Sequence, residues 1–305
     1  MATWQSPNQL DDQPILFRAR DYHELTGFLR QDIPLNLFQL CWLEKNGVEA
    51  NQPNAFHFRG RRDGAGELQA AALVITNRLL LLDARGGEHA AFLGAWYGRN
   101  GAHLLHHIVS AKSSVEPFWQ AYRTGNALAG ARLIQDQELY YLTPDLLEEA
   151  LAVESQPGPS PSAIRTALSQ DLDGLFLASV RMHREETLED PLERDPELFR
   201  RHVQHRVDSG RSFVWTDSHR RLLFKADISA QGNDGLQISG VFTAPMLRGQ
   251  GYASRAMFDL CQILFDQGAP LITLYVNHTN TAAKRVYTRV GFRYYADYQT
   301  VFVAV

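Results

Sequence analysis

The chain has 305 residues, of which 45% are hydrophobic and 21% are charged, as is usual for globular domains. At about 100–200 residues per domain, this length favours two domains. The net charge of −4 gives no support for a nucleic-acid surface, and no apolar run approaches the ~18 residues of a membrane span. The first 12 residues are polar and resemble no signal peptide, so we expect a cytoplasmic protein that binds neither nucleic acid nor membrane.

Cysteines and histidines give no sign of a metal site. Cys41 and Cys261 each fall in an apolar helical stretch, which favours buried thiols over a disulfide or a metal ligand. The histidine groups lack cysteine or acidic partners at metal-ligand spacing. These groups are His103, His106 and His107, and His202 and His205.

Apolar periodicity alternates between helical and extended along the chain. Helices are predicted at 22–45, 88–97, 115–123, 172–186, 196–209, 251–267 and 281–290. Strands are predicted at 68–82 (interrupted near Asn77), 103–110, 133–142, 213–216, 221–228, 236–243, 271–276 and 293–305. This order predicts an α/β (α+β) protein.

The segment Glu154–Ser162 contains three prolines and a glycine but no apolar side chain. Such a segment neither packs nor continues a helix. We place a linker at 155–163, between domains at 1–154 and 164–305. The two halves are similar in size and element order, which is compatible with a duplication.

A glycine-containing loop stands between the strand predicted at 236–243 and the helix that follows. Gly249 and Gly251 let the backbone approach a ligand closely, and successive N–H groups then meet the positive end of the helix dipole. Arg248 adds planar donors that suit a phosphate. These groups together suit a pyrophosphate.

Three other kinds of loop also place glycines between a strand and a helix. A glycine pair alone is also found in plain turns. A dinucleotide-binding loop should be followed by an acidic residue after the next strand, which here ends in Asn277. A Walker A loop is excluded, because no Gly-Lys-Ser/Thr sequence occurs.

Two motifs then resemble the GNAT superfamily of N-acetyltransferases. The segment Arg248–Ala253 matches the family's coenzyme A motif, Arg-x-x-Gly-x-Ala. The segment Asn280–Phe292 matches its second signature, Asn-x-x-Ala-x-x-x-Tyr-x-x-x-Gly-Phe. Two motifs in the right order and spacing are far more specific than either alone.

The resemblance extends over most of the chain to bacterial two-domain GNAT proteins with an uncharacterised GNAT-like N-terminal domain. The stretches that carry it are 32–38, 131–137, 182–186, 224–227 and 274–277. It implies tandem GNAT-like domains, each a mixed, mostly antiparallel sheet flanked by helices. The first domain is predicted to be degenerate, because Glu88 would stand at the helix N-terminus where a phosphate should bind.

The resemblance implies acetyl-CoA as co-substrate and no metal. The strand end 241–243 would hold the pantetheine, and an amide at or near Phe242 would face the thioester carbonyl. Asn280 would both cap its helix and contact the cofactor. The cofactor-binding residues predicted are Val241, Phe242, Thr243, Arg248, Gly249, Gln250, Gly251, Tyr252, Ala253, Ser254, Asn280 and Ala283.

Tyr287 is the predicted general acid, because a phenol can protonate a departing thiolate; a core tyrosine is the alternative. Glu185 or Glu186 is the predicted general base, against the alternative of a solvated acidic loop. Asp227 is the other candidate base, since an acid on a central strand needs a reason. The family more often has glutamate at this position.

The leading functional hypothesis is acetyl-CoA-dependent N-acetyl transfer to a primary amine, by direct attack in a ternary complex. The acceptor would be a small molecule, an amino acid or a peptide or protein. The alternative is a non-catalytic acyl-CoA-binding or regulatory module. The first domain would be structural or form a wall of the acceptor site, and a homodimer is compatible with the sequence.

Overall fold

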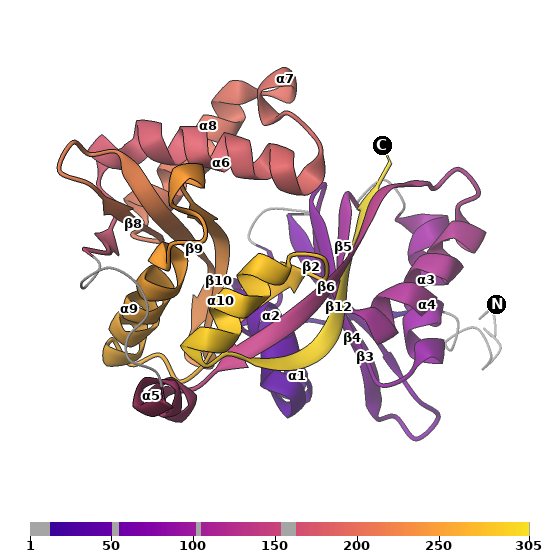
Figure 1. Ribbon diagram of the computed structural model, residues 1–305. Coiled ribbons are helices and arrows are strands. Elements are labelled where there is room, and N and C mark those ends of the chain that lie inside the picture. The colour runs from indigo at the N-terminus through magenta and orange to yellow at the C-terminus, as the bar shows by residue number, and fades with distance from the viewer. Residues whose placement is uncertain (1–12, 51–54, 102–104, 154–162, 305) are drawn as a thin grey trace, which may run out of the picture. The chain divides into compact units, whose positions relative to one another are not determined.

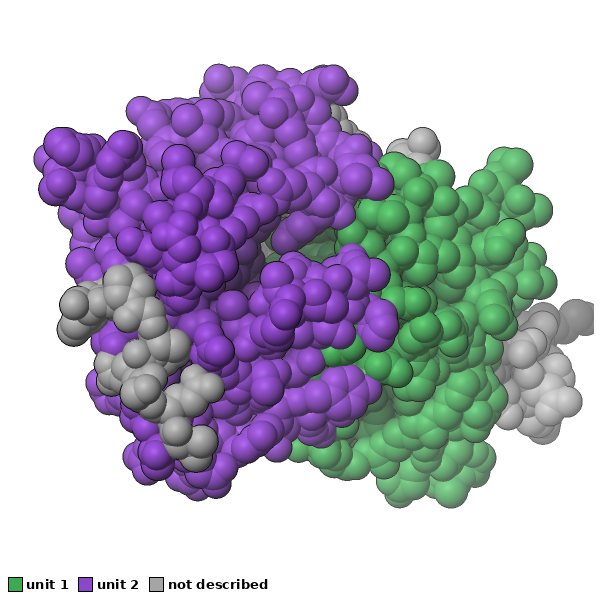
Figure 2. Space-filling view, viewed as in Figure 1, with its two compact units in different colours: residues 1–139, 296–305 green, residues 140–295 purple. Residues whose placement is uncertain are grey.

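The computed structural model describes residues 13–50, 55–101, 105–153 and 163–304 (Figure 1). The chain forms two compact units (Figure 2). Unit 1 comprises Met1–Leu139 and Ala296–Val305, and unit 2 comprises Tyr140–Tyr295.

The sheet of unit 1 runs in the order β1-β2-β3-β4-β5-β12-β6. The strands β4 and β5 are parallel, whereas β1 to β4 pair antiparallel in sequence and β5 pairs antiparallel with β12. Their bounds are β1 Ile15–Leu16, β2 Phe56–Arg62, β3 Leu68–Ile75, β4 Leu79–Ala84, β5 His107–Ala111, β6 Ala131–Leu142 and β12 Arg293–Val303. Because β6 and β12 are long, each also contributes residues to unit 2.

The helices of unit 1 are α1 (Tyr22–Leu29), α2 (Ile33–Asn46), α3 (Gly87–Asn100) and α4 (Lys112–Gly125), with short 3-10 turns η2 (Ala19–Asp21) and η3 (Arg30–Asp32). The single helix predicted at 22–45 was wrong in one respect, since it breaks at η3. There the Asp32 side chain accepts a hydrogen bond from the Leu35 N–H at 3.3 Å and starts a new helix with Pro34 in its first turn. The strand β2 was missed, because its arginines mask the apolar alternation.

The sheet of unit 2 runs in the order β11-β10-β9-β8-β7, with β6 beside β11. The pair β10–β11 is parallel, and the pairs β9–β10, β8–β9 and β7–β8 are antiparallel. Strand bounds are β7 Arg165–Thr166, β8 Ser212–Thr216, β9 Leu222–Gly232, β10 Gly235–Thr243 and β11 Ile272–Asn277. Helix bounds are α5 Pro144–Val153, η5 Ser169–Asp171, α6 Leu172–Thr187, α7 Pro191–Arg194, α8 Pro196–Asp208, η6 Pro245–Leu247, α9 Tyr252–Asp266 and α10 Thr281–Val290.

Both units repeat one order of elements. A short strand and helices come first, and an antiparallel meander of three strands follows. A helix, a parallel strand and a second helix come next. This confirms the predicted mixed, mostly antiparallel sheets flanked by helices. The predicted helices and strands of the second half are all present within a few residues, whereas α5 and α7 were not predicted. The shared order agrees with the suggested duplication.

The compact units do not divide the chain at the predicted linker. Residues 154–162 lie outside the described ranges, so the boundary at 155–163 stays a prediction. The boundaries between the two units fall instead between residues 139 and 140 and between residues 295 and 296. The reason is β12, which pairs with β5 from Tyr298↔Ala111 to Phe302↔His107 and so places the last residues in unit 1.

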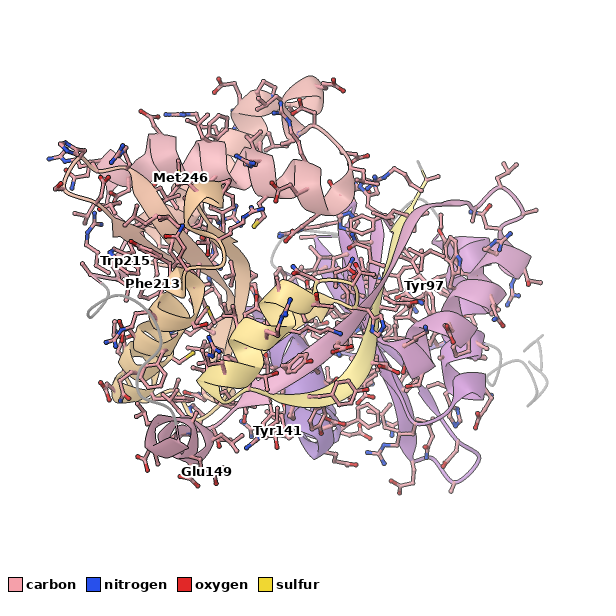
Figure 3. The ribbon with its side chains drawn as sticks, viewed as in Figure 1. Tyr97, Tyr141, Glu149, Phe213, Trp215 and Met246 are labelled. Carbon is pink, nitrogen blue, oxygen red and sulfur yellow. The ribbon has the colours of Figure 1, made fainter. Side chains whose placement is uncertain are left out.

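The sheet of unit 2 has two different faces. One face carries Phe213 and Trp215 of β8 (Figure 3), in the core that α9 and α10 cover. On the other face, the register aligns Val214 of β8 with Lys225 of β9, while Leu175 of α6 packs with Val214. The sheet therefore separates an apolar core from a layer that contains a buried charge.

Within the described ranges, no helix is both long and apolar enough to cross a membrane. Cys41 and Cys261 are buried, as predicted. No group of three or more potential metal-binding His, Cys, Asp or Glu side chains occurs in the part of the chain that the structure describes, and His103 lies outside that part.

Candidate active site

The parallel strands β10 and β11 pair over only a short distance. Their register contains Leu236↔Ile272 and Gln237↔Thr273, and no further pair between these two fully described strands. Beyond Gln237, β10 is irregular against β9, with register shifts on both sides of Ile238–Ser239. The carboxyl end of β10 thus leaves its parallel neighbour, and backbone groups along that edge become available to an extended ligand.

Gly240 makes this irregularity possible. Its φ is +60°, a left-handed conformation that L side chains rarely adopt. A Cβ at Gly240 would lie 2.6 Å from an Asp227 carboxylate oxygen and 3.1 Å from the Lys225 Nζ. Glycine is therefore required here by both backbone conformation and space. The predicted pantetheine strand, 241–243, begins directly after it.

The loop after β10 leads to an open helix N-terminus. Gly249 has φ +78° and Gly251 has φ +84°, and a Cβ at Gly249 would meet no atom within 4 Å. Gly251 is the N-cap of α9, where no hydrogen bond from a described side chain satisfies the first-turn amides. Arg248, Gly249 and Gln250 are exposed, as is Met246 just before them (Figure 3).

The helices α7, α8 and α10 of unit 2 are capped by a side chain, whereas α6, like α9, has no side-chain cap. Asp195 accepts from the Leu198 N–H at 2.8 Å at the start of α8. Asn280 accepts from the Ala283 N–H at 3.1 Å at the start of α10, as predicted for its capping role. Because the first-turn N–H groups of α9 lack such a partner, they can receive an anion at the positive end of the helix dipole.

Arg248 is held over the end of β10. Its Nε donates to the Thr243 carbonyl at 3.3 Å, and its guanidinium lies 5.8 Å from the centre of the Phe242 ring. Its Nη2 also forms an ion pair with Glu185 Oε2 at 3.2 Å. Tertiary structure thus joins the predicted phosphate loop to one of the two predicted bases.

The two predicted bases differ in their surroundings. Burial raises the pKa of Glu185, but hydrogen bonds from Arg181 and Arg248 outweigh it and leave this pKa below its usual value. Burial raises the pKa of Glu186 more than the nearby ammonium of Lys225 lowers it, and the charge of Glu185 adds to the increase. The side chain of Glu186 stays accessible to water, although part of it is desolvated. A raised pKa makes Glu186 the better proton acceptor.

Tyr287 is buried, with only 6% of its surface exposed, and its ring packs edge-on against Phe292 at 5.9 Å. Burial raises the pKa of its phenol well above the usual range, and Glu186 adds to this shift. The Tyr287 phenol therefore carries its proton at neutral pH. It is a weaker acid than an ordinary tyrosine.

Two polar side chains that interact electrostatically with Glu186 were missed from the sequence. Tyr275 in β11 is 37% exposed overall, but desolvation of its phenol raises its pKa, and the charge of Glu186 raises it further. Lys225 in β9 is fully buried and acts on Glu186 with the opposite sign. Nothing in the apolar run around Tyr275 marks it, whereas Lys225 stands out as a charge inside a strand pattern.

Asp227 is a poor candidate for the base in this structure. It is 2% exposed, and its oxygens accept from Ser212 Oγ at 2.7 Å and from Lys225 Nζ at 2.6 Å. Burial raises the pKa of Asp227, but the charges of Lys225 and Arg206 outweigh it and lower the pKa below its usual value. A carboxylate held in this way is a weak proton acceptor.

The remaining predicted cofactor residues fall on the same part of unit 2. Val241 and Thr243 are half-buried at the end of β10, while Tyr252 packs against Trp215 with 5.1 Å between ring centres. Ser254 is buried in the first turn of α9. Ala253 and Ala283 are half-buried in the first turns of α9 and α10.

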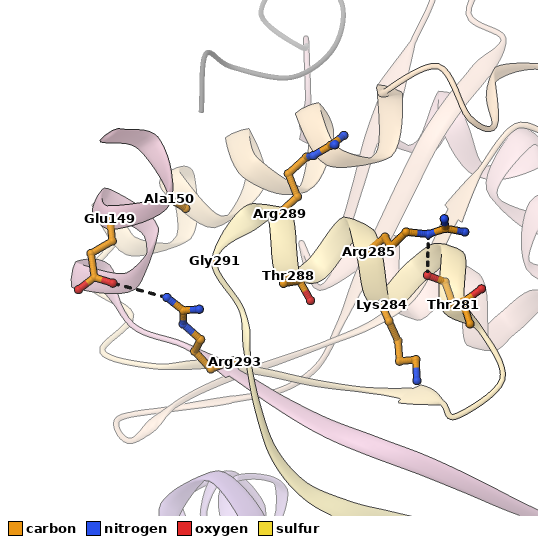
Figure 4. Close-up of a pocket in the computed structure, with 9 residues that line it drawn as sticks. All are labelled: Glu149, Ala150, Thr281, Lys284, Arg285, Thr288, Arg289, Gly291 and Arg293. Carbon is orange, nitrogen blue, oxygen red and sulfur yellow. Dashed lines mark hydrogen bonds and ion pairs between the residues drawn. The ribbon is translucent and has the colours of Figure 1, made fainter. Parts of the chain in front are cut away.

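A separate open cavity of about 840 Å³ lies along the outer side of α10 (Figure 4). Four cations line it together with Glu149, which pairs with Arg293 at 3.7 Å. The predicted catalytic and cofactor residues are not among its lining, which is Glu149, Ala150, Thr281, Lys284, Arg285, Thr288, Arg289, Gly291 and Arg293. This cavity is therefore distinct from the loop and strand edge described above.

Unit 1 places different groups at the corresponding positions. A Cβ at Gly86, the N-cap of α3, would lie 2.6 Å from a Glu88 carboxylate oxygen, so this carboxylate lies at the helix N-terminus as predicted. The helices α3 and α4 touch through backbone. A Cβ at Gly94 would lie 2.1 Å from the Phe118 carbonyl oxygen, and one at Gly98 would lie 2.3 Å from that of Tyr122.

Comparison with known proteins agrees with the motifs and the fold. Residues 180–292 match the acetyltransferase (GNAT) family. Among curated proteins, no sequence matches the chain.

Several solved structures share the fold over nearly the whole chain. A GCN5-related N-acetyltransferase from Sphaerobacter thermophilus is 15% identical with a TM-score of 0.56, covering 95% of this chain and 94% of that one. A GNAT-family acetyltransferase from Colwellia psychrerythraea is 13% identical with a TM-score of 0.54, covering 95% and 99%. A tandem GNAT protein from the clavulanic acid biosynthesis pathway is 15% identical with a TM-score of 0.54, covering 96% and 98%.

At such identities the solved structures establish only the fold. Residues 180–292 of this chain match the GNAT acetyltransferase family, and the chain shares its fold with GNAT proteins that include a tandem one.

Proposed function

We propose that unit 2 is an acetyl-CoA-dependent N-acetyltransferase that acts on a primary amine by direct attack in a ternary complex. The observation that carries this proposal is the uncapped, glycine-flanked N-terminus of α9, which follows the loop after a strand that diverges from its parallel neighbour. This arrangement offers N–H donors for a pyrophosphate and a free strand edge for an extended amide chain.

The residues present fit coenzyme A. The amides of 249–254 and the guanidinium of Arg248 would bind its pyrophosphate, and the backbone of 241–243 would bind the pantetheine. Asn280 and Ala283 would line the start of α10 beside it. Gly249 supports this fit, because a Cβ there would point into open space rather than into protein. The bound thioester supplies the acyl group.

Each step then has a residue of this chain. Glu186, directly or through a water, takes the proton that the amine loses as it attacks. An N–H donor at or near Phe242 stabilises the oxyanion, a contribution worth about 2.7–4 kcal/mol in other enzymes. The Tyr287 phenol gives its proton to the departing sulfur. Glu185 orients Arg248 rather than serving as the base, since it is already paired.

The acceptor is proposed to be a small molecule, an amino acid or a peptide amine. Unit 1 is proposed to be a degenerate GNAT-like domain that binds no coenzyme A, because Glu88 lies at the N-terminus of α3 and the α3 and α4 backbones are in contact.

A thiol-release assay tests the proposal. The full chain is mixed with acetyl-CoA and a panel of amines, amino acids and peptides, and free thiol is followed over time. Calorimetry with coenzyme A is run in parallel. Tight binding together with amine-dependent thiol release supports the enzyme. Tight binding without release for any amine would favour a non-catalytic acyl-CoA-binding module instead, and absence of binding would overturn both.

A further inference from the structure

The neighbouring strands β9 and β10 (Figure 1) have a pairing that is interrupted twice, in opposite directions. Between Gln237 and Ile238, β9 contains one extra residue. Between Ser239 and Phe242, β10 contains one extra residue, which is a β-bulge at residues 240–241. A bulge changes which backbone groups of its strand face the partner strand and which are left unpaired. The position of this second bulge therefore decides which groups at the end of β10 a ligand can reach.

The hydrophobic core explains why the pairing is irregular but not where the second bulge lies. Ile238 is 1% exposed and belongs to the core under α9 and α10. A regular ladder would turn Ile238 to the opposite face of the sheet, which is unfavourable. A second bulge one residue further along β10 would leave Ile238 in the core equally well. Another feature must therefore fix this bulge at 240–241.

Gly240 places the bulge against a buried ion pair. Its φ of +60° suits the left-handed residue of a bulge. A Cβ at this position would lie 2.6 Å from Asp227 Oδ2 and 3.1 Å from Lys225 Nζ. The residues on either side are Ser239 and Val241, which both carry a Cβ. Glycine is thus the residue of this stretch that can lie over the pair.

The ion pair is itself held by three elements of unit 2. Lys225 of β9 is fully buried and Asp227 is 2% exposed, with 2.6 Å between Nζ and Oδ2. Ser212 Oγ of β8 donates to Asp227 Oδ1 at 2.7 Å, and Arg206 Nη1 of α8 lies 3.6 Å from Oδ2. Burial of two charges carries a desolvation penalty that their attraction often fails to offset, and an apolar pair is often at least as stable. Structural specificity is therefore a better reason for this pair than stability.

We propose that the Lys225–Asp227 pair is a positioning element that fixes the bulge of β10 at Gly240, and with it the backbone groups of 241–243 that bind the pantetheine. The role in cofactor binding rests on the function proposed for unit 2. Because the pair fits beneath a glycine, it selects one of the bulge positions that the core at Ile238 allows. Without the pair, the bulge is free to move along β10, and other N–H groups and carbonyls then face the cofactor.

Hydrogen exchange in the ligand-free full chain tests the position of the bulge without a cofactor. The variant Lys225→Met/Asp227→Asn removes both charges together, nearly keeps the side-chain volumes and leaves Ser212 an acceptor. Amide exchange at 239–243, followed by NMR, should become about tenfold faster or more, while exchange at 235–237 stays unchanged. Unchanged exchange at 239–243 in this variant, once folded, would overturn the proposal.

The ion pair of Arg165 and Asp171 provides the matched control. Arg165 Nη1 lies 2.7 Å from Asp171 Oδ2, and Asp171 is 7% exposed. Arg165 belongs to β7, which β8 and β9 separate from β10. Arg165→Met/Asp171→Asn should lower the melting temperature but leave exchange at 239–243 and coenzyme A affinity unchanged. Faster exchange at 239–243 to the same extent in both double variants would show that any lost ion pair has this effect, against the proposal.

Binding of two probes separates a displaced bulge from general damage to the site. Coenzyme A carries a pyrophosphate and a pantetheine, whereas adenosine diphosphate carries the pyrophosphate alone. In calorimetry, Lys225→Met/Asp227→Asn should weaken coenzyme A binding about tenfold or more and leave adenosine diphosphate binding unchanged. Equal losses for both probes would indicate a merely structural role and overturn the proposal. If the unchanged protein binds neither probe, the function proposed for unit 2 fails, and exchange at 239–243 alone decides on the pair.

A milder variant covers the case in which Lys225→Met/Asp227→Asn fails to fold. Arg206→Gln/Ser212→Ala keeps the ion pair and removes the two outer contacts of Asp227, and the Arg206 side chain is 30% exposed, so its loss is tolerable. Exchange at 239–243 should again become faster, and coenzyme A affinity should fall more than that of adenosine diphosphate. A folded Arg206→Gln/Ser212→Ala variant that shows neither change would rule out the positioning role.

Discussion

Glu185 Oε2 lies 3.2 Å from Arg248 Nη2, so the end of α6 is tied to the loop that precedes α9. These residues are 63 positions apart in sequence. The two adjacent glutamates differ, since Glu185 is bound to the loop that precedes α9, whereas Glu186 interacts electrostatically with Lys225, Tyr275 and Tyr287.

Substitution of this ion pair should affect coenzyme A binding in opposite ways. Arg248→Ala should weaken the affinity about tenfold or more, because charge-assisted hydrogen bonds to a pyrophosphate are lost. Glu185→Gln should leave the affinity equal or higher, because the competing carboxylate is gone. Isothermal titration calorimetry checks both. An Arg248→Ala variant that binds as tightly as the unchanged protein would remove Arg248 from the site.

Gly249 offers a matched pair of variants with Gly268. Both have positive φ, +78° and +92°, and a Cβ at either would meet no atom within 4 Å. Valine at either position should therefore cost a similar strain of about 1–2 kcal/mol in stability. Only Gly249→Val should also weaken coenzyme A binding, because only this side chain would enter the phosphate loop. Equal affinities for the two variants in calorimetry would argue against the loop assignment.

The phenols Tyr287 and Tyr275 can be separated by turnover. Tyr287→Phe should lower kcat about 10²-fold or more, as expected for loss of a general acid. Tyr275→Phe should change kcat much less, although KM for the amine can change because the Tyr275 phenol and Glu186 interact electrostatically. Steady-state kinetics with one amine serves for both. Full turnover by Tyr287→Phe would eliminate its proposed role.

The raised pKa of Glu186 has consequences for pH dependence. As a base it must be ionised, so kcat/KM should rise with pH through a midpoint above the ordinary value of 4.5 for glutamate. In the folded state a raised acid pKa favours the neutral form, so its contribution to stability is present below 4.5 and is lost as pH rises through the folded pKa. Glu186→Gln should therefore melt at a higher temperature than the unchanged protein at pH 7. This difference in melting temperature should be smaller at pH 4. A melting-temperature difference that is the same at both pH values would contradict the raised pKa.

Unit 1 should bind no coenzyme A, so the stoichiometry per chain should be one in calorimetry. A stoichiometry of two would show that unit 1 retains a site.

The closed contact of α3 and α4 is tested by Gly98→Ala, whose Cβ would lie 2.3 Å from the Tyr122 carbonyl oxygen. Overpacking of this kind costs about 1–3 kcal/mol of unfolding free energy. Gly27→Ala in α1 is the control, because a Cβ there meets nothing within 4 Å and alanine favours the helix by about 0.5–1 kcal/mol.

Local patterns in the sequence were sufficient for the loop and for most elements of the second half. Gly249 and Gly251 mark positive φ directly, and Asn280 marks the start of α10, because these features depend on neighbouring residues alone. The same kind of signal failed for the helix at 22–45, where Asp32 and Pro34 start a second helix inside one apolar period. The polar strand β2 was missed because its apolar alternation is broken by arginines.

Tertiary structure alone decided which residues act on one another. The sequence by itself predicted a phosphate loop and contains a second signature and a pair of adjacent glutamates. Which glutamate pairs with Arg248 depends on how α6 lies against the loop before α9, a contact between segments that are distant along the chain. The pairing of β12 with β5 is likewise a contact between distant segments, so local periodicity carries no record of it.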